Sequence, residues 1–232
     1  MEMIIKCPDC GKDLKVTVEE VHPETVKRKF TVAIEETLDA IANSINRGDI
    51  DVGEELSFTL KDGTDVTFVV AHLNPYGENE AVLVLKDCLP ERHVMNEEWT
   101  NEGGWRDSDM RKYLREKVYP LLPDDLKAHI KTRLIVQNHN GEELRSEDDI
   151  WLLSRTEVFG GENSVDVGDV HFDLFSDERS RVKQINGETA WYSLRSPWSS
   201  NTANFAIVAT TGDEYSNGAS SSNGVSFGFL FA

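Results

Sequence analysis

The sequence predicts an α+β domain made of short antiparallel strands and a few helices. Apolar and polar residues alternate through 56–70 on either side of Asp62-Gly63, a dipeptide typical of tight hairpins. A third apolar run, at 81–85, completes an antiparallel meander with one buried face. Apolar residues recur with helical spacing at 30–46 and again at 107–118.

Composition limits the class of protein. Of the 232 residues, 39% are hydrophobic, enough for the core of one large domain or of one domain with a small appendage. The 42 acidic and 24 basic residues give a net charge of -18, which repels phosphate backbones and anionic membranes. We therefore expect neither nucleic acid nor a membrane as a partner. The charge serves either solubility, the commoner case, or a specific acidic binding face.

The sequence also limits the compartment in which we expect the protein. No apolar run approaches the roughly 18 residues that span a bilayer, and residues 1–7 lack the features of a secretory signal. Three cysteines do not make a disulfide framework. We expect synthesis in the cytoplasm and a reducing environment.

Residues 1–20 resemble a zinc-ribbon knuckle, with two short strands flanking Cys7-Pro8-Asp9-Cys10-Gly11. Cys7 and Cys10 are therefore candidate zinc ligands, held at a turn that the glycine permits. A closed tetrahedral site needs four ligands, so His22 or a second chain would have to supply the others. The alternative is a degenerate knuckle without metal.

Residues 21–48 are interpreted as a linker followed by an amphipathic helix. Its apolar stripe consists of Ile34, Leu38, Ile41 and Ile45. The stripe either docks on the main domain, the commoner outcome, or pairs with a second chain. In the second case residues 1–48 would form a homo-oligomer.

Residues 49–232 form the main domain in this interpretation. Asp107 or Ser108 can cap the helix that runs to residue 118, and Pro123 favours a second helix. Two short buried strands are expected at 134–136 and 150–153, followed by one helical turn at 154–160.

The stretch 161–186 predicts a long surface loop, because it contains four aspartates and few apolar residues. Asp166, Asp169 and Asp173 could gather a calcium ion, but their spacing matches no calcium loop. A solvated acidic loop is the preferred interpretation.

Ordered motifs from about residue 50 to residue 232 resemble a family of bacterial and phage proteins. They are Trp105-Arg106-Asp107-Ser108-Asp109-Met110-Arg111-Lys112-Tyr113-Leu114, Leu122-Pro123, residues 152–160, and Leu194-Arg195-Ser196-Pro197. The C-terminal signature of that family is Trp-Trp-Leu-Arg-Ser-Pro, followed by Gly-Val-Arg-Pro-Ala-Phe. The chain departs from it at Tyr192-Ser193, which replace the two tryptophans, and at residues 224–229.

That family is similar in turn to the C-type-lectin-like fold of formylglycine-generating enzymes and of retroelement variable proteins. The resemblance implies that the segment between the Arg-Ser-Pro turn and the last strand displays ligand-contacting side chains on a rigid scaffold. A formylglycine-generating activity would need two active cysteines in this domain, which contains only Cys88. The six histidines match no catalytic or metal-binding motif.

Residues 190–232 are the expected binding region, because apolar ends bracket a small, polar, glycine-rich segment. A buried strand at 205–208 indicates that this segment is ordered. The candidate ligand-binding residues are Trp198, Asn201, Asn204, Asp213, Tyr215, Asn217, Ser221 and Asn223. Trp191 and Trp198 flank Arg195, and core packing around a buried arginine is favoured over an aromatic platform for a ligand.

The sequence therefore predicts a non-enzymatic module that binds a protein or glycan ligand, either as a component of a phage or prophage particle or as a host-associated display protein. Two alternatives stay open. One is an enzyme on a formylglycine-generating-like scaffold, and the other is a structural protein whose C-terminal loop contacts a neighbouring subunit.

Overall fold

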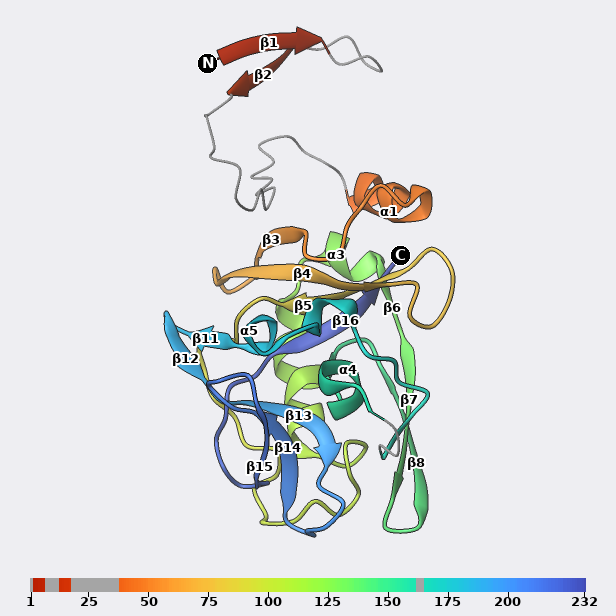
Figure 1. Cartoon of the computed structure of the whole chain (residues 1–232), viewed down its shortest axis with the longest axis vertical. Coiled ribbons are helices and arrows are strands. Elements are labelled where there is room, and N and C mark those ends of the chain that lie inside the picture. Colours follow the sequence, from red (N-terminus) through yellow and green to blue (C-terminus); the bar gives the residue numbers. More distant parts are fainter. Residues whose placement is uncertain (1, 7–12, 18–37, 162–164) are drawn as a thin grey trace. The chain divides into compact units, whose positions relative to one another are not determined.

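The computed structural model describes residues 2–6, 13–17, 38–161 and 165–232 (Figure 1). The chain divides into two compact units, Met1–Phe30 and Thr31–Ala232. In the first unit, β1 (Glu2–Lys6) pairs antiparallel with β2 (Asp13–Thr17), as the sequence predicts. The knuckle between these strands, with Cys7 and Cys10, lies outside the described residues, as does His22.

The second unit is an α+β domain whose described strand pairs are almost all antiparallel, which confirms the predicted fold class. Its main sheet has the order β3-β4-β5-β16-β6, and β9 also pairs with β16. These strands are β3 (Glu55–Thr59), β4 (Asp65–Leu73), β5 (Ala81–Leu85), β6 (Ile130–Lys131), β9 (Trp151–Leu152) and β16 (Phe227–Phe231).

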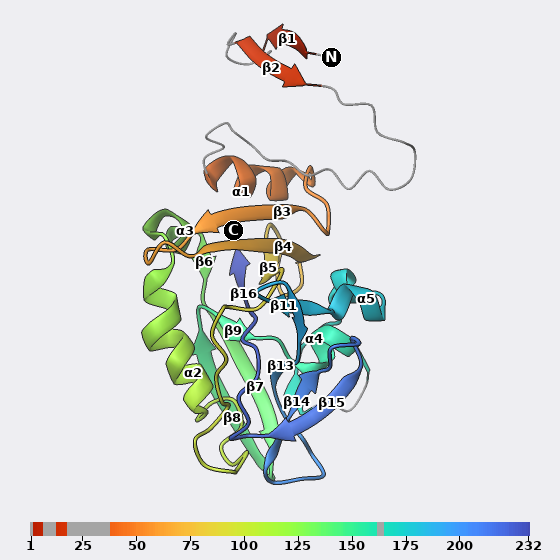
Figure 2. The same cartoon turned by 90° about the vertical axis from the view of Figure 1, so that its left-hand side faces the viewer.

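The C-terminal strand β16 lies in the middle of this sheet, next to β5 (Figures 1 and 2). Every residue of β5 and of β16 is buried. Gly228 is required there because a Cβ would lie 2.9 Å from the carbonyl oxygen of Leu83 on the adjacent strand. The chain end is therefore part of the core.

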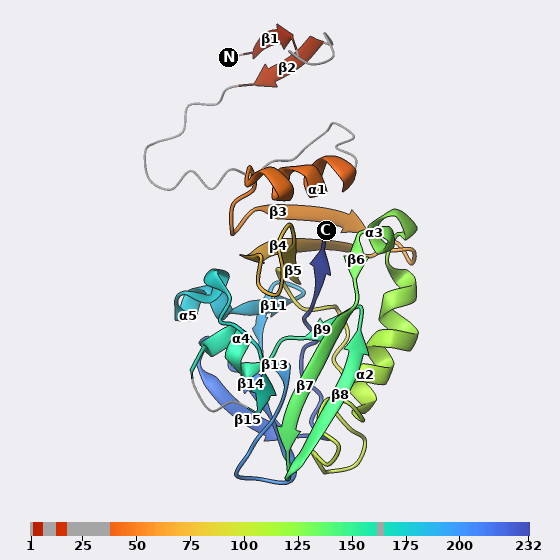
Figure 3. The same cartoon turned by 90° about the vertical axis from the view of Figure 1, so that its right-hand side faces the viewer.

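Helix α1 (Leu38–Arg47) docks on the main unit, the commoner of the two predicted outcomes. Ile41 and Ile45 are buried in the core, and Leu38 packs against it. Figure 3 shows α1 alongside β3. Among the helices of the described part of the chain, none is long and apolar enough to cross a membrane.

The predicted helix that runs to residue 118 begins at α2 (Asp109–Tyr113), where the Ser108 side chain accepts a hydrogen bond from the Arg111 backbone N–H. It continues as η1 (Leu114–Val118) and η2 (Tyr119–Leu121), and α3 (Asp124–Ala128) follows with Pro123 at its N-cap. The apolar stripe Met110, Leu114 and Val118 is buried, as its spacing predicts.

A second sheet has the order β10-β7-β8, with β7 (Arg133–His139), β8 (Glu142–Asp148) and β10 (Asp166–Val167). Asn140 and Gly141, both at positive φ, make the β7–β8 turn. The prediction of a buried strand at 134–136 is wrong in its facing, because Leu134 is 50% exposed. Arg133, Ile135 and Gln137 point inward instead.

A third sheet has the order β13-β14-β15, formed by β13 (Tyr192–Pro197), β14 (Asn204–Val208) and β15 (Glu214–Gly218). The predicted buried strand at 205–208 is confirmed as part of β14. A small hairpin, β11 (Lys183–Ile185) and β12 (Glu188–Ala190), precedes it.

The predicted helical turn at 154–160 is α4 (Arg155–Phe159), which begins at a capping box between Ser154 and Glu157. The prediction of a surface loop at 161–186 holds only in part: most residues described there are exposed or half-buried, but short elements and a few buried residues interrupt the loop. This stretch contains η3 (Asp173–Phe175) and α5 (Glu178–Arg181), and Phe172 and Phe175 have no exposed surface. The side chains of Asp166 and Asp169 are also buried, because arginine side chains neutralise them.

Candidate functional site

The sheet β13-β14-β15 carries the predicted binding region. Side chains directly opposite each other on antiparallel strands share a face, so the register places Ser193, Ile207 and Tyr215 on one face. Asn217 lies on the same face, two residues after Tyr215. Among the described strands, β15 is the edge strand of this sheet.

Three large aromatic side chains near this sheet are exposed: Trp99 by 71%, Tyr215 by 60% and Trp191 by 39%. The ring centroids of Trp191 and Tyr215 are 6.0 Å apart. Trp99 reaches the end of β15, where a Cβ on Gly218 would lie 3.4 Å from the indole Nε1 and from Ser221 Oγ. Gly218 lies three residues after Tyr215, so Trp99 and Ser221 contact the face of β15 opposite to Tyr215. We call Trp99, Trp191, Tyr215, Asn217 and Ser221 the recognition surface, which wraps around this edge strand.

The structure leaves seven of the eight predicted ligand-binding residues at least partly exposed. Asn201, Asp213 and Tyr215 are exposed, whereas Trp198, Asn204, Asn217 and Ser221 are half-buried. Asn223 is a correction, because it is only 4% exposed and its Nδ2 donates to Ser193 Oγ at 3.3 Å. Its side chain stabilises the sheet from the buried side and is not available to a ligand.

Hydrogen bonds order the polar segment. Asn204 Nδ2 donates to Ser216 Oγ at 3.2 Å, across the β14–β15 pair. Asn217 Nδ2 donates to Asn223 Oδ1 at 3.2 Å. Asn201 Oδ1 accepts a hydrogen bond from the backbone N–H of Ala203 at 2.7 Å. The segment is thus a folded surface and not a flexible linker.

Trp198 lies apart from the exposed aromatic residues. It packs partly against the core and lines a hollow of about 250 Å³ together with residues 196–200, Arg155 and Glu214. Arg155 and Glu214 form a bidentate ion pair there, with Nη2 3.0 Å from Oε2. Both charges are therefore already paired.

The two tryptophans that flank Arg195, Trp191 and Trp198, are less buried than the residues between them. Trp191 is 39% exposed, whereas Tyr192 has no exposed surface and donates its hydroxyl to the Arg181 carbonyl oxygen at 2.9 Å. Core packing is thus provided by Tyr192 and not by Trp191. The favoured interpretation of Trp191 as core is wrong, and its ring belongs to the surface.

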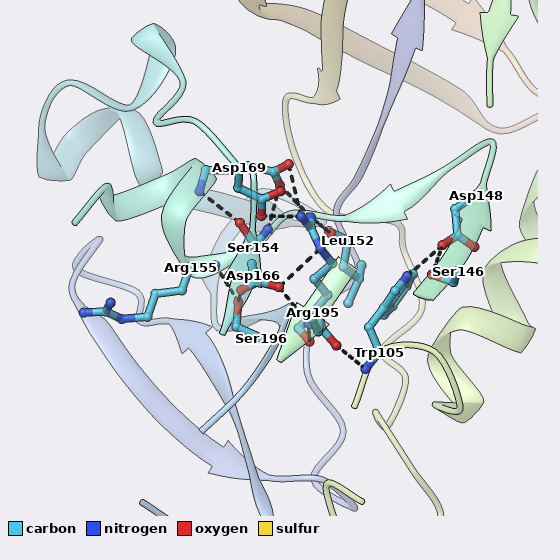
Figure 4. Close-up of polar contacts among 12 residues, drawn as sticks. Trp105, Ser146, Asp148, Leu152, Ser154, Arg155, Asp166, Asp169, Arg195 and Ser196 are labelled. Carbon is cyan, nitrogen blue, oxygen red and sulfur yellow. Dashed lines mark hydrogen bonds and ion pairs between the residues drawn. The ribbon is translucent and has the colours of Figure 1, made fainter. Parts of the chain in front are cut away.

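Arg195 itself is fully buried, as predicted (Figure 4). Its Nη1 donates to the Leu152 carbonyl oxygen at 2.9 Å and to Glu157 Oε2 at 2.7 Å. Its Nη2 bonds Asp169, and its Nε lies 3.6 Å from Asp166 Oδ1. One arginine on β13 therefore joins α4, β9 and the stretch 166–169.

A second arginine, Arg133 on β7, completes this ionic core. It bonds both Glu157 and Asp169, and its guanidinium lies 3.8 Å from the centroid of the Tyr76 ring. The Tyr76 hydroxyl donates to Glu157 Oε1 at 2.9 Å. Glu157 also accepts a hydrogen bond from the Ser154 backbone N–H at 2.7 Å. The network has three carboxylates for two guanidinium groups.

The pKa values of two carboxyl groups in this network shift in opposite directions. Burial alone would raise the pKa of Glu157, but Arg195 and Arg133 outweigh burial and lower this pKa to about 2. Burial raises the pKa of Asp169 to about 6, against the attraction of Arg195, and the negative charges of Glu157 and Asp166 add to the rise. Asp169 thus protonates before Glu157 as the pH falls.

The ionic core holds the sheets together and is closed to ligands. Asp166 accepts from Gln137 Nε2 at 2.7 Å and from the Ser196 hydroxyl, and Gln137 Oε1 accepts from the Trp105 backbone N–H at 2.7 Å. Figure 4 shows these contacts linking β7, β13 and the loop that carries Trp105. In the part of the chain that is described, no group of three His, Cys, Asp or Glu side chains could hold a metal ion.

Sequence reasoning missed Trp99 as a surface residue and Arg133 as a core residue. Trp99 follows Glu97 and Glu98 in a stretch without apolar periodicity, and a lone aromatic residue in such a stretch was an available signal. No local sequence signal indicated that Arg133 is buried, because its partners Glu157 and Asp169 are 24 and 36 residues away.

These features define a class: an α+β domain in which a buried ionic core supports an exposed aromatic surface. Residues 79–229 match the family described as Domain of unknown function (DUF6273), which covers more than half of the chain. The chain therefore belongs to this family. Searches of the curated proteins and of the solved structures found no match.

Proposed function

We propose that the protein is a non-enzymatic binding module and that the recognition surface contacts a protein or glycan ligand. The observation that carries this proposal is the exposure of Trp99, Trp191 and Tyr215 around one small sheet. Large aromatic side chains are usually buried, and exposed aromatic residues with polar neighbours are typical of binding sites.

The rigidity of the surface favours binding further. Asn217 and Ser221 offer hydrogen-bonding groups beside the rings, and Asn223 holds Asn217 in place from the buried side. A preformed surface loses little conformational entropy when it binds. The ionic core beneath it fixes β13, the strand that follows Trp191.

We further propose that the main unit has a C-type-lectin-like fold. Support comes from the placement of residues 198–226 between β13 and the central strand β16, as the family resemblance implies. Zinc at Cys7 and Cys10, a homo-oligomer through residues 1–48 and assembly into a phage particle stay predictions from the sequence.

Paired double variants test the proposed function. Trp99→Ala with Tyr215→Ala removes two rings from the recognition surface, and Leu134→Ala with Val167→Ala removes two exposed apolar side chains from the β10-β7-β8 sheet. Fluorescently labelled wild type and variants are applied to a glycan array and to intact bacterial cells of the species that encodes the chain.

We expect wild type and the Leu134/Val167 variant to bind alike, and the Trp99/Tyr215 variant to lose binding by tenfold or more, about 1.4 kcal/mol, as loss of aromatic hot spots does. Thermal midpoints should stay close to wild type, since exposed positions carry little stability. Equal binding by both variants, with normal melting, would overturn the proposal. Array binding identifies a glycan ligand, whereas binding to cells that protease treatment abolishes identifies a protein.

A further inference from the structure

The register of the β14–β15 pair decides which backbone groups of β15 face outward. The Ala209 N–H donates to the Asp213 carbonyl oxygen at 2.9 Å beyond one end of this pair, and the Ala219 N–H donates to the Ala203 carbonyl oxygen at 2.7 Å beyond the other end. Opposite residues that share hydrogen bonds alternate, in an antiparallel pair, with opposite residues that do not. The odd-numbered residues of β15 therefore bond β14, and the even-numbered residues direct their N–H and C=O groups to the outer edge.

This outer edge is occupied at both ends of β15. Just before the strand, the Gly212 carbonyl oxygen accepts a hydrogen bond from Arg181 Nε at 2.8 Å. At the last residue of the strand, the Gly218 carbonyl oxygen accepts from the Ser221 N–H at 2.9 Å, and the Gly218 N–H donates to Asn217 Oδ1 at 2.9 Å. These contacts limit any further pairing to the middle of the strand.

The middle of the edge is open among the residues that the structure describes. None of them forms a hydrogen bond with the outward N–H and C=O groups of Glu214 and Ser216. No described strand lies beyond β15 in its sheet (Figure 2). Glu214 and Ser216 are both partly exposed, and Tyr215 between them is 60% exposed. Two residues at this spacing present the donors and acceptors with which one more strand would pair.

Aromatic rings flank the same edge on both faces of the sheet. Tyr215 and Trp191 lie together on one face, with ring centroids 6.0 Å apart. Trp99 lies on the other face beside Gly218, and it is 71% exposed. Successive side chains of a strand point to opposite faces, so a strand beside β15 would direct alternate side chains to the two sets of rings. A glycan lacks both this alternation and the backbone groups of a strand.

Charge further limits the partner. Asp213 is exposed at one end of the edge, and Glu98 is exposed next to Trp99 at the other end. No lysine or arginine of the described residues forms an ion pair with either carboxylate. The net charge of -18 also repels acidic segments at long range. These charges favour a partner segment with a basic side chain.

We propose that the recognition surface binds an extended segment of another protein, which adds to the outer edge of β15 as a further strand. The segment pairs with the backbone of Glu214 and Ser216, carries large apolar side chains at alternate positions, and includes a basic residue. Backbone pairing supplies affinity in such complexes, and the contacts of alternate side chains supply specificity. This inference rests on the proposed function and selects a protein segment over a glycan.

The probe is a library of random linear peptides of about ten residues, long enough for one strand. Each peptide is linked to its encoding messenger RNA and selected on wild type. Sequences that also bind the Trp99/Tyr215 variant are removed, and those kept are tested on the Leu134/Val167 control. One enriched peptide is then synthesised with a single N-methyl group at each successive amide. Methylation removes one donor, so a bound strand should be weakened about tenfold at every second amide and clearly less between them.

Hydrogen exchange of the backbone amides measures the pairing on the protein itself, without a substitution in β15. In the free protein, the Ser216 amide should exchange faster than those of Tyr215 and Asn217, which bond β14. A saturating amount of the enriched peptide should slow exchange at Ser216 about tenfold or more. The amide of Arg145, on the edge strand β8 of another sheet, is the control and should not change.

We expect enriched peptides that depend on the rings, show the two-residue alternation and protect Ser216. Equal sensitivity to methylation at successive amides, or unchanged exchange at Ser216, would overturn the added strand. Failure to enrich any ring-dependent peptide would overturn it as well. In that case, ring-dependent binding to the glycan array or to cells would keep the proposed function, and its absence would overturn both.

Discussion

Arg195 on β13 and Glu157 on α4 face each other without any exposed surface, with Nη1 2.7 Å from Oε2 and Nη2 3.3 Å from Oε1. Such a buried pair is costly to create and costlier to break, since removal of one partner leaves an uncompensated charge. The pair therefore makes a direct prediction about stability.

Glu157→Gln should lower the free energy of unfolding by about 3–5 kcal/mol, because Arg195 and Arg133 would both lose a negative partner in the interior. The control is Glu214→Gln, which breaks the partly exposed pair with Arg155 and should cost about 1 kcal/mol or less. Urea unfolding of both variants measures the difference. Equal costs would show that the buried network does not hold the fold.

Asp169 makes stability depend on pH with an unusual sign. Its pKa is raised in the folded state, from 3.8 to about 6, so the folded protein binds this proton more tightly than the unfolded chain does. The contribution of Asp169 should therefore decline as pH rises from about 4 to about 6. Glu157 has the opposite sign and acts at lower pH, because its pKa falls from 4.5 to about 2.

Comparison of wild type with Asp169→Asn isolates this effect, since asparagine cannot titrate. Unfolding free energies of both proteins are measured in urea at intervals from pH 4 to pH 7. Wild type should lose stability relative to the variant across that range. A constant difference, or a relative gain by wild type, would mean that the pKa of Asp169 is not raised.

The neighbours Trp191 and Tyr192 should differ sharply in their contribution to stability. Tyr192→Ala removes a fully buried ring and its hydrogen bond to Arg181, and should cost about 3–5 kcal/mol. Trp191→Ala removes a partly exposed ring and should cost about 1 kcal/mol or less. Thermal unfolding of the two variants measures this difference. A larger loss of stability in Trp191→Ala than in Tyr192→Ala would show that Trp191 is a core residue.

Cys7 and Cys10 offer only half of a tetrahedral site, so zinc should bind at about one ion per two chains, or more weakly with His22. Elemental analysis of protein kept reduced measures the ratio. Cys88→Ser is the control, because burial raises the pKa of that thiol to about 12 and leaves little thiolate to bind metal. Absence of zinc from the reduced protein would contradict the prediction that Cys7 and Cys10 bind this metal.

Local patterns predicted the elements whose signals are local. The 56–85 meander, the helix from Ser108 and the turn after Ser154 follow from periodicity and capping. Strand β8 escaped notice because two of its inward positions are polar, Ser146 and Asp148. Asp148 is buried because Trp105 and Arg111, 43 and 37 residues away, bond its oxygens.

The same distinction between local and distant signals applies to the candidate site. The C-terminal polar segment and Tyr215 were found from composition, whereas the burial of Asn223 and of Asp169 depends on distant partners. Asp169 meets Arg195 across 26 residues and Arg133 across 36, and Asn223 meets Ser193 across 30. No short stretch of sequence contains both partners of such a pair. From their polarity and charge alone, Asn223 and Asp169 were therefore predicted to be exposed to solvent.

Site-specific photo-crosslinking tests the central claim most directly, that the recognition surface binds a partner. A benzophenone amino acid replaces Tyr215, which is 60% exposed, and in a control protein it replaces Leu134, which is 50% exposed on the β10-β7-β8 sheet. Both proteins are irradiated in cells of the species that encodes the chain. We expect one discrete adduct from position 215, lost when Trp99→Ala is added, and none of that mass from position 134. The same adduct from both positions, or from position 215 regardless of Trp99, would contradict the account.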